Sequence, residues 1–128
     1  MAKVGIVLVS HSARVAEGIK EILEEVVTDV PIQTAGGTDT GEIGTSFPKI
    51  MEAIEKAYTE KGVLVFYDLG SAMMNAEMAV EQLSLDKVIV AEGIPLVEGA
   101  YVAAVEASMG HDLKEVFKRV KETFSNNQ

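Results

Sequence analysis

His11 and Asp68 are two residues of this 128-residue chain whose types and positions could do chemistry together. Each follows a short apolar run, 4–9 before His11 and 62–67 before Asp68. A carboxylate beside an imidazole can accept the Nδ1–H proton, which leaves Nε2 as a free nucleophile and stabilises positive charge on the ring when Nε2 is substituted. This pattern predicts a nucleophilic histidine supported by a carboxylate. The alternative is a histidine and a helix-capping aspartate that never meet.

Four further residues could bind an anion beside the histidine, two from a glycine-rich segment and two that come two and three residues after Asp68. They are Gly37, Thr38, Gly70 and Ser71. Backbone N–H groups in turns and at helix starts bind phosphate, and a single phosphoryl group needs only one or two such donors. The four residues could therefore bind a single phosphoryl group carried by His11.

The glycine-rich segment 36–44 does not resemble a nucleotide-binding loop. No Gly-Lys-Ser/Thr follows it, and its acidic side chains Asp39 and Glu42 would repel a polyphosphate. The segment can also be explained as a turn that leads to a helix cap at Thr45 or Ser46.

Other chemistries fit the sequence less well. Two histidines without cysteine give poor spacing for a metal site, so we expect no bound metal. Ser10 and Ser12 flank His11 but lack the Gly-x-Ser-x-Gly turn of hydrolases. The second histidine, His111, is expected to be a solvated surface residue at a junction between two helices.

The segments that must position these residues alternate between short apolar runs and longer runs with helical spacing. This alternation predicts an α/β fold, a doubly wound and mainly parallel four-stranded sheet with helices on both faces. The predicted strands are 4–9, 31–35, 62–67 and 87–91. The first and third are almost continuously apolar and should be the central strands. The turns after parallel strands share one edge of the sheet, which would bring His11 and Asp68 together.

Apolar stripes predict the helices between the strands. The first three stripes are Val15, Ile19, Ile22, Leu23 and Val26; Phe47, Ile50, Met51, Ile54 and Tyr58; and Ala72, Ala76, Ala79, Val80 and Leu83. Small residues form the fourth, at Val97, Ala100, Ala104 and Ala107. An acidic capping box at 112–115 should start a last helix that runs through Phe124. The stretch 100–107, or an adjoining sheet edge, is a candidate homodimer contact.

Length and charge limit the organisation and the partners. We expect one domain over residues 1–128, with a polar tail at about 125–128. With 20 acidic and 11 basic residues the formal net charge is −9, and no basic stretch is present, which argues against a nucleic-acid partner. No apolar run reaches the roughly 18 residues of a membrane span, and the absence of cysteine suits a reducing compartment. These observations predict a soluble, cytoplasmic protein.

The segments at the expected sheet edge carry a resemblance to a known family. They are 7–14, 36–38 with 41–46, 68–72 and 95–100. Together they resemble the phosphotransferase subunits of phosphoenolpyruvate-dependent dihydroxyacetone kinases, a branch of the mannose-type IIA family of the sugar phosphotransferase system. The resemblance covers nearly the whole chain and implies the same doubly wound α/β fold.

The resemblance implies a phosphotransferase that acts as a phosphocarrier. The histidine matching His11 takes a phosphoryl group from phospho-HPr, holds it as a tele-phosphohistidine, and passes it to ADP on the nucleotide-binding kinase subunit for phosphorylation of dihydroxyacetone. The aspartate matching Asp68 supports that histidine, and homodimers are common. The chain itself would bind no cofactor, because ADP and ATP stay on the partner subunit.

Two departures from the wider family affect this expectation. Some relatives continue into HPr-like and enzyme-I-like domains, so this chain would need phospho-HPr from the general system. Sugar-specific domains usually carry Gly-Gly-Ser-Pro after the aspartate, whereas residues 70–73 are Gly-Ser-Ala-Met, which favours the dihydroxyacetone branch. The alternatives are a mannose-type IIA component for sugar uptake or regulation, and a non-catalytic interaction module on the same fold.

Overall fold

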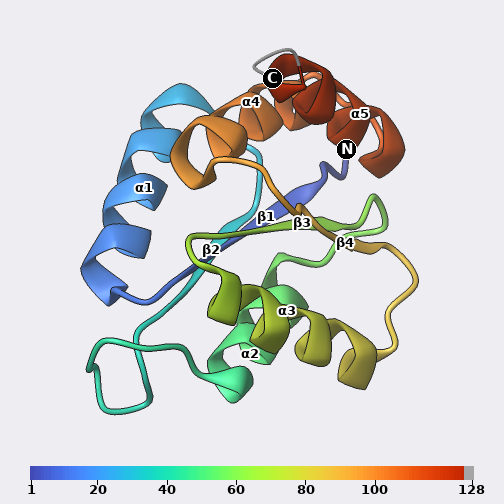
Figure 1. Ribbon diagram of the computed structural model, residues 1–128. Coiled ribbons are helices and arrows are strands. Elements are labelled where there is room, and N and C mark those ends of the chain that lie inside the picture. Colours follow the sequence, from blue (N-terminus) through green and yellow to red (C-terminus); the bar gives the residue numbers. More distant parts are fainter. Residues whose placement is uncertain (126–128) are drawn as a thin grey trace.

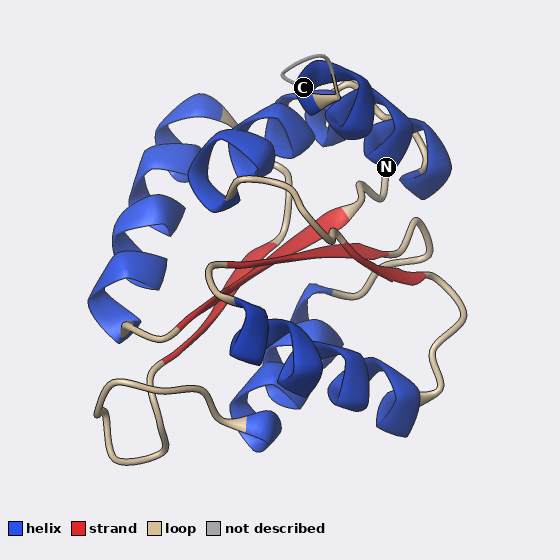
Figure 2. Cartoon of the chain, in the orientation of Figure 1, coloured by secondary structure: helices blue, strands red, loops and turns tan. Residues whose placement is uncertain are grey.

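The computed structural model of the protein describes residues 1–125 and shows a four-stranded sheet between two layers of helices (Figure 1, Figure 2). The strands are β1 (Gly5–Ser10), β2 (Ile32–Gly36), β3 (Val63–Tyr67) and β4 (Val88–Val90). Their order is β2-β1-β3-β4, and all three neighbouring pairs are parallel. The structure confirms the predicted α/β fold, with β1 and β3 as the central strands.

The two faces of the sheet are covered by different helices. On one face lie α1 (Ala13–Val26), α4 (Leu96–Ser108) and α5 (Leu113–Phe124), and on the other lie α2 (Phe47–Ala57) and α3 (Gly70–Leu83). Successive side chains of a strand point to opposite faces, so β1 and β3 each supply both cores. Ile6 and Phe66 pack under the first layer, whereas Val7 and Val65 pack under the second. No helix in the part of the chain described here is long and apolar enough to span a bilayer.

The stripe predicted for the first helix is wider than the face that α1 buries. Ile19 and Leu23 are buried, but Val15, Ile22 and Val26 are 47%, 54% and 44% exposed. The helix packs against β1, β2 and α4, and β2 is the outermost strand on this side of the sheet. Only part of its apolar surface therefore meets a neighbour.

The small residues of α4 face the interior. Ala100, Ala104 and Ala107 are fully buried in the core of the sheet's first face, while Val97 is 43% exposed. Small side chains let the helix approach the strands closely, as at Gly99, where an added Cβ would lie 3.0 Å from the Phe66 ring. The alanine side chains are therefore not available to a partner; a homodimer contact at this helix or at an adjoining sheet edge remains a prediction.

The last helix begins as the capping box predicts. The Asp112 side chain accepts a hydrogen bond of 2.9 Å from the Glu115 amide. Ser125 caps the other end of α5. The rest of the expected polar tail, residues 126–128, lies outside the described residues.

Gly5 is required where β1 passes the end of α2. A Cβ at this position would lie 2.1 Å from the Ala57 carbonyl oxygen. We expect Gly5→Ala to lower the free energy of unfolding by about 2–3 kcal/mol, because two backbone segments must move apart. Gly18→Ala is the matched control, because a Cβ there meets nothing within 4 Å in the middle of α1. Chemical denaturation should show the control stabilised by about 0.5–1 kcal/mol; equal effects would contradict this packing.

Candidate functional site

His11 and Asp68 lie in contact at the carboxyl edge of the sheet. Val9 pairs with Tyr67 in the parallel register of β1 and β3, so the two chains leave their strands side by side. The His11 Nδ1 atom is 3.0 Å from Asp68 Oδ1. The side chains are 19% and 23% exposed, so the pair is sheltered but still reachable from solvent. The alternative, in which the histidine and the aspartate are not in contact, is wrong.

The Asp68 carboxylate is held by four hydrogen-bond donors. Oδ1 faces the His11 ring and accepts a hydrogen bond of 2.7 Å from the Leu69 amide. Oδ2 accepts from the His11 amide and from the Ser10 hydroxyl, both at 2.9 Å. Burial raises the pKa of Asp68, but these hydrogen bonds outweigh it and leave the pKa below its ordinary value. The site therefore keeps a charged, oriented acceptor behind the imidazole.

The lowered pKa of Asp68 predicts how the stability depends on pH. A carboxyl group with a depressed folded-state pKa contributes stability that is present above its unfolded value, 3.8, and is lost as the pH falls through the folded value. The difference in the free energy of unfolding between the native chain and Asp68→Asn should therefore be largest near about pH 5 and shrink toward about pH 2. Urea unfolding of both proteins across this range measures it. A difference that stays constant down to about pH 2 would contradict the charged carboxylate.

The other ring nitrogen of His11 faces the start of α3. The Nε2 atom lies 2.8 Å from the Ser71 hydroxyl oxygen. Because a charged Asp68 can only accept at Nδ1, the ring proton belongs on Nδ1, and Nε2 keeps its lone pair and accepts from Ser71. The geometry thus presents Nε2 as the nucleophilic atom.

The first turn of α3 offers free donors next to Nε2. The N-cap, Leu69, makes no side-chain capping bond, and the first N–H groups of a helix have no partner within it. Among residues 1–125, the amides of Gly70 and Ser71 donate to no acceptor elsewhere in the chain. Both residues are exposed. The start of α3 can therefore bind an anionic group that is attached to His11 Nε2.

The other two expected phosphate-binding residues are placed differently. The Gly37 amide donates to the Ser10 carbonyl at 3.1 Å, and the Thr38 amide donates to the Glu42 carbonyl at 2.9 Å. Their N–H groups are therefore occupied inside the loop and cannot bind a phosphoryl group in this conformation. The structure corrects this part of the prediction.

The glycine-rich loop instead supports the histidine from the side. Besides the bond from Gly37 to the Ser10 carbonyl, the Gly44 amide donates to the His11 carbonyl at 2.9 Å, so both ends of the loop are bonded to the end of β1 and to the histidine that follows it. Gly37 and Gly44 have φ values of 75° and 144°, which glycine adopts without strain. The loop is a scaffold for the end of β1.

Lys49, which the sequence analysis did not single out, binds the start of this loop through its side chain. The Lys49 ammonium donates to the Gly36 and Thr38 carbonyls at 2.8 and 3.2 Å. Ser46 is the N-cap of α2, which decides between the two predicted caps, and Thr45 accepts a hydrogen bond from Asn75 of α3. The second layer of helices is thereby tied to the loop beside His11.

Ser10 is a further site residue that sequence reasoning named only as a neighbour of His11. It is fully buried, and its hydroxyl lies between Asp68 and the amide of Ser12. The strand alternation offers a signal for it, since Ser10 continues the face of Ile6 and Leu8, and a hydroxyl on a buried face needs a partner.

His111 is less solvated than expected. Its side chain is 29% exposed, and Nε2 lies 3.4 Å from Glu106, which also neighbours Arg119 at 3.5 Å. The histidine is part of a charged cluster between α4 and α5. Within residues 1–125, no three His, Cys, Asp or Glu side chains converge as a metal-binding group.

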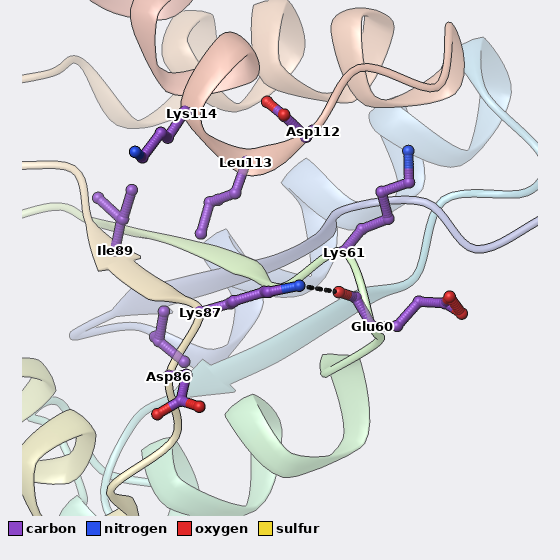
Figure 3. A pocket seen from close by; sticks show the side chains of 9 residues that line it. Glu60, Lys61, Asp86, Lys87, Ile89, Asp112, Leu113 and Lys114 are labelled. Carbon is purple, nitrogen blue, oxygen red and sulfur yellow. Dashed lines mark hydrogen bonds between the residues drawn. The ribbon is translucent and has the colours of Figure 1, made fainter.

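A cavity of about 570 Å³ lies at the opposite, amino edge of the sheet (Figure 3). It is bordered by Lys61 and Lys87, which precede β3 and β4, and by Leu113 at the start of α5. Lys87 donates to the Glu60 carbonyl at 2.9 Å. The cavity contains none of the residues that surround His11, so it is separate from the candidate site.

Comparison with known proteins agrees with the fold and the site. The family model EIIA-man, described as "PTS system fructose IIA component", matches residues 5–117, and the chain belongs to this family. The phosphoryl donor subunit DhaM of phosphoenolpyruvate-dependent dihydroxyacetone kinase 1 from Listeria innocua is 49% identical over 105 residues, which cover 82% of each chain. The phosphotransferase subunit DhaM of the dihydroxyacetone kinase of Lactococcus lactis is 41% identical and covers 92% of this chain and 90% of that one.

Longer relatives and solved structures show the same similarity. The DhaM subunit of Escherichia coli K12 is 40% identical over 121 residues, which are 88% of this chain but 25% of that protein. A crystal structure of EF1359, described as a protein of unknown function, has 32% identity and a TM-score of 0.79, with 94% of each chain covered. A sigma-54 interaction domain protein from Enterococcus faecalis shares the fold, at 18% identity and a TM-score of 0.71.

Proposed function

We propose that this protein is the phosphocarrier subunit of a phosphoenolpyruvate-dependent dihydroxyacetone kinase. His11 accepts a phosphoryl group from phospho-HPr on Nε2 and transfers it to ADP on the nucleotide-binding kinase subunit, where the resulting ATP serves to phosphorylate dihydroxyacetone. The observation that carries the proposal is the His11 ring, fixed at Nδ1 by Asp68 and presented through Nε2 to the start of α3. The DhaM relatives, named as phosphoryl donor subunits, support the choice of pathway.

The charging step forms one bond and breaks another. The lone pair of His11 Nε2 attacks the phosphorus in line, the bond between phosphorus and the donor nitrogen breaks, and the electron pair stays on the donor. The proton stays on Nδ1, where Asp68 accepts its hydrogen bond and stabilises the charge that the ring gains. Ser71 must release Nε2 during this step, and its hydroxyl then points toward the incoming phosphoryl oxygens.

The phosphoryl group is held by the first turn of α3. The donors are the free amides of Gly70 and Ser71 and the Ser71 hydroxyl, which contacts Nε2 in the unphosphorylated protein. The positive end of the helix favours the negative charge of the phosphoryl group. Gly37 and Thr38 contribute indirectly, by fixing the loop beside His11.

Histidine suits a carrier because its phosphorylated nitrogen is a good leaving group, so the phosphoryl group can be passed on. The rim around Nε2 consists of small or exposed residues, and both donor and acceptor proteins must reach the same atom. Transfer between them needs mainly positioning and charge stabilisation. The carrier acts in the cytoplasm, and an edge strand of the sheet, β2 or β4, would serve a homodimer.

The acceptor distinguishes this proposal from a sugar-specific IIA component, the alternative that the family description "fructose IIA component" favours. We expect the chain, charged with phosphoenolpyruvate, enzyme I and HPr and then freed of donor, to lose its phosphate to the ADP-loaded kinase subunit within one turnover. Intact-mass measurement follows the loss, and the nucleotide-free subunit is the control. Retention of the phosphate with ADP present, and discharge to a sugar IIB domain, would support the alternative.

A further inference from the structure

We propose that Ser10 is a positioning residue, which fixes the plane of the Asp68 carboxylate and thereby selects the His11 tautomer that leaves Nε2 free. Its effect on the tautomer concerns the unphosphorylated protein alone. Its effect on the rate of phosphoryl transfer rests on the proposed function.

The hydrogen bonds of Ser10 have a defined direction. Its side chain is fully buried. The Ser12 amide donates to Ser10 Oγ at 3.0 Å, and this hydroxyl lies 2.9 Å from Asp68 Oδ2. An amide can only donate, and a charged carboxylate can only accept, so the Ser10 hydroxyl proton must point at Oδ2.

This contact decides how firmly the carboxylate is oriented. With Ser10, each Asp68 oxygen has two donors, Ser10 and the His11 amide on Oδ2, and the Leu69 amide and the His11 ring on Oδ1. Without the Ser10 hydroxyl, Oδ2 keeps one donor, and rotation of the carboxylate separates Oδ1 from Nδ1 at a smaller loss of hydrogen bonds. The neutral ring can then place its proton on Nε2, which removes the nucleophilic lone pair.

The neighbouring Ser12 provides a control that separates orientation of Asp68 from general stabilisation of this segment. Ser12, two residues further on, is the N-cap of α1 and accepts a hydrogen bond of 3.3 Å from the Val15 amide. Its side chain stabilises the helix start without any contact to Asp68. Ser12→Ala therefore disturbs the same segment while leaving the carboxylate in place.

The test is the ¹⁵N NMR spectrum of the His11 ring in the unphosphorylated 128-residue chain, recorded at a pH at which the spectrum itself shows a neutral ring. Wild type should be almost entirely in the Nδ1–H tautomer. Ser10→Ala should move the population severalfold toward Nε2–H, and Ser10→Thr, which keeps the hydroxyl, should restore it. Ser12→Ala should lower the melting temperature and leave the tautomer unchanged.

A kinetic measurement connects the tautomer to transfer. Ser10→Ala should lower the single-turnover rate of charging by phospho-HPr roughly tenfold, because a misplaced reacting group loses its orientation, while KM for the donor stays within about twofold. Ser10→Cys keeps the shape of the side chain with a somewhat larger atom and a weak donor, and it should show the same changes to a smaller extent. It replaces Ser10→Ala in the test if Ser10→Ala does not fold.

A wild-type tautomer in both Ser10→Ala and Ser10→Cys would overturn the proposal, as would an equal tautomer shift in Ser12→Ala. A loss confined to KM would also overturn it, because positioning acts after the donor has bound. Failure of wild type to accept phosphate from phospho-HPr would refute the proposed function, and the tautomer measurement would still decide the role of Ser10.

Discussion

His11→Ala is expected to abolish phosphorylation of the chain by phosphoenolpyruvate, enzyme I and HPr. No other nucleophile beside the start of α3 is both free and held by a carboxylate among the residues that the structure describes. Ser71, the nearest hydroxyl, has Nε2 of His11 as its only base, at 2.8 Å, and the substitution removes that base. Intact-mass measurement after incubation should show the unmodified mass.

His111→Ala is the matched control for this experiment. It removes the second histidine of the chain, which lies near Glu106 between α4 and α5 and away from the carboxyl edge of the sheet. The control should be charged as fully as wild type. Labelling of His11→Ala, or loss of labelling in His111→Ala with the fold intact, would refute the assignment of the nucleophile.

Asp68→Asn should slow charging by about 10²–10⁴-fold while the fold is retained. Asp68 accepts four hydrogen bonds, and an amide can accept on one side only, so one pair of donors meets an NH₂ group. If the amide nitrogen faces the ring, Nδ1 must become an acceptor, and the proton moves to Nε2. The nucleophilic lone pair is then lost in most of the molecules.

A rapid-quench single-turnover experiment with phospho-HPr measures this effect, and KM for the donor should change little. Asp39→Asn is the matched control, because Asp39 is an exposed carboxylate of the glycine-rich loop that accepts a hydrogen bond from Ser46 and has no contact with His11. Its rate should stay within about threefold of wild type. Equal slowing in both variants would show that the loss of one negative charge is sufficient to slow transfer. It would contradict a specific role of Asp68.

The sequence was sufficient to predict the fold and the two residues at the centre of the site, but not whether their side chains meet. Apolar runs that are nearly continuous mark buried parallel strands, and β1 and β3 are such runs. Once these strands are neighbours, the residues that follow them must share an edge, so the topology brings His11 and Asp68 close together, and the structure shows that their side chains are in contact. The cap of α5 at Asp112 is equally local, because it depends on residues within one turn.

The remaining parts of the site depend on the path of the backbone, which residue types alone do not determine. Gly37 and Thr38 are suited to anion binding by type, but the loop folds so that their amides bond to carbonyls of the chain itself. Lys49 is a common surface residue until α2 places its ammonium under the same loop. The apolar pattern of α1 predicts an amphipathic helix, but it does not predict how many neighbouring elements cover the apolar side, and Ile22 is left exposed.

The most direct test of the central claim is the identity of the phosphorylated atom. NMR of the phosphorylated chain, with ¹⁵N in the histidine rings, should show coupling of ³¹P to Nε2 of His11 and a protonated Nδ1 that donates to Asp68. The phosphate should also be lost in acid. Coupling to Nδ1, or an acid-stable phosphate on Ser71, would contradict the account, because the structure presents Nε2 as the only ring nitrogen with a free lone pair.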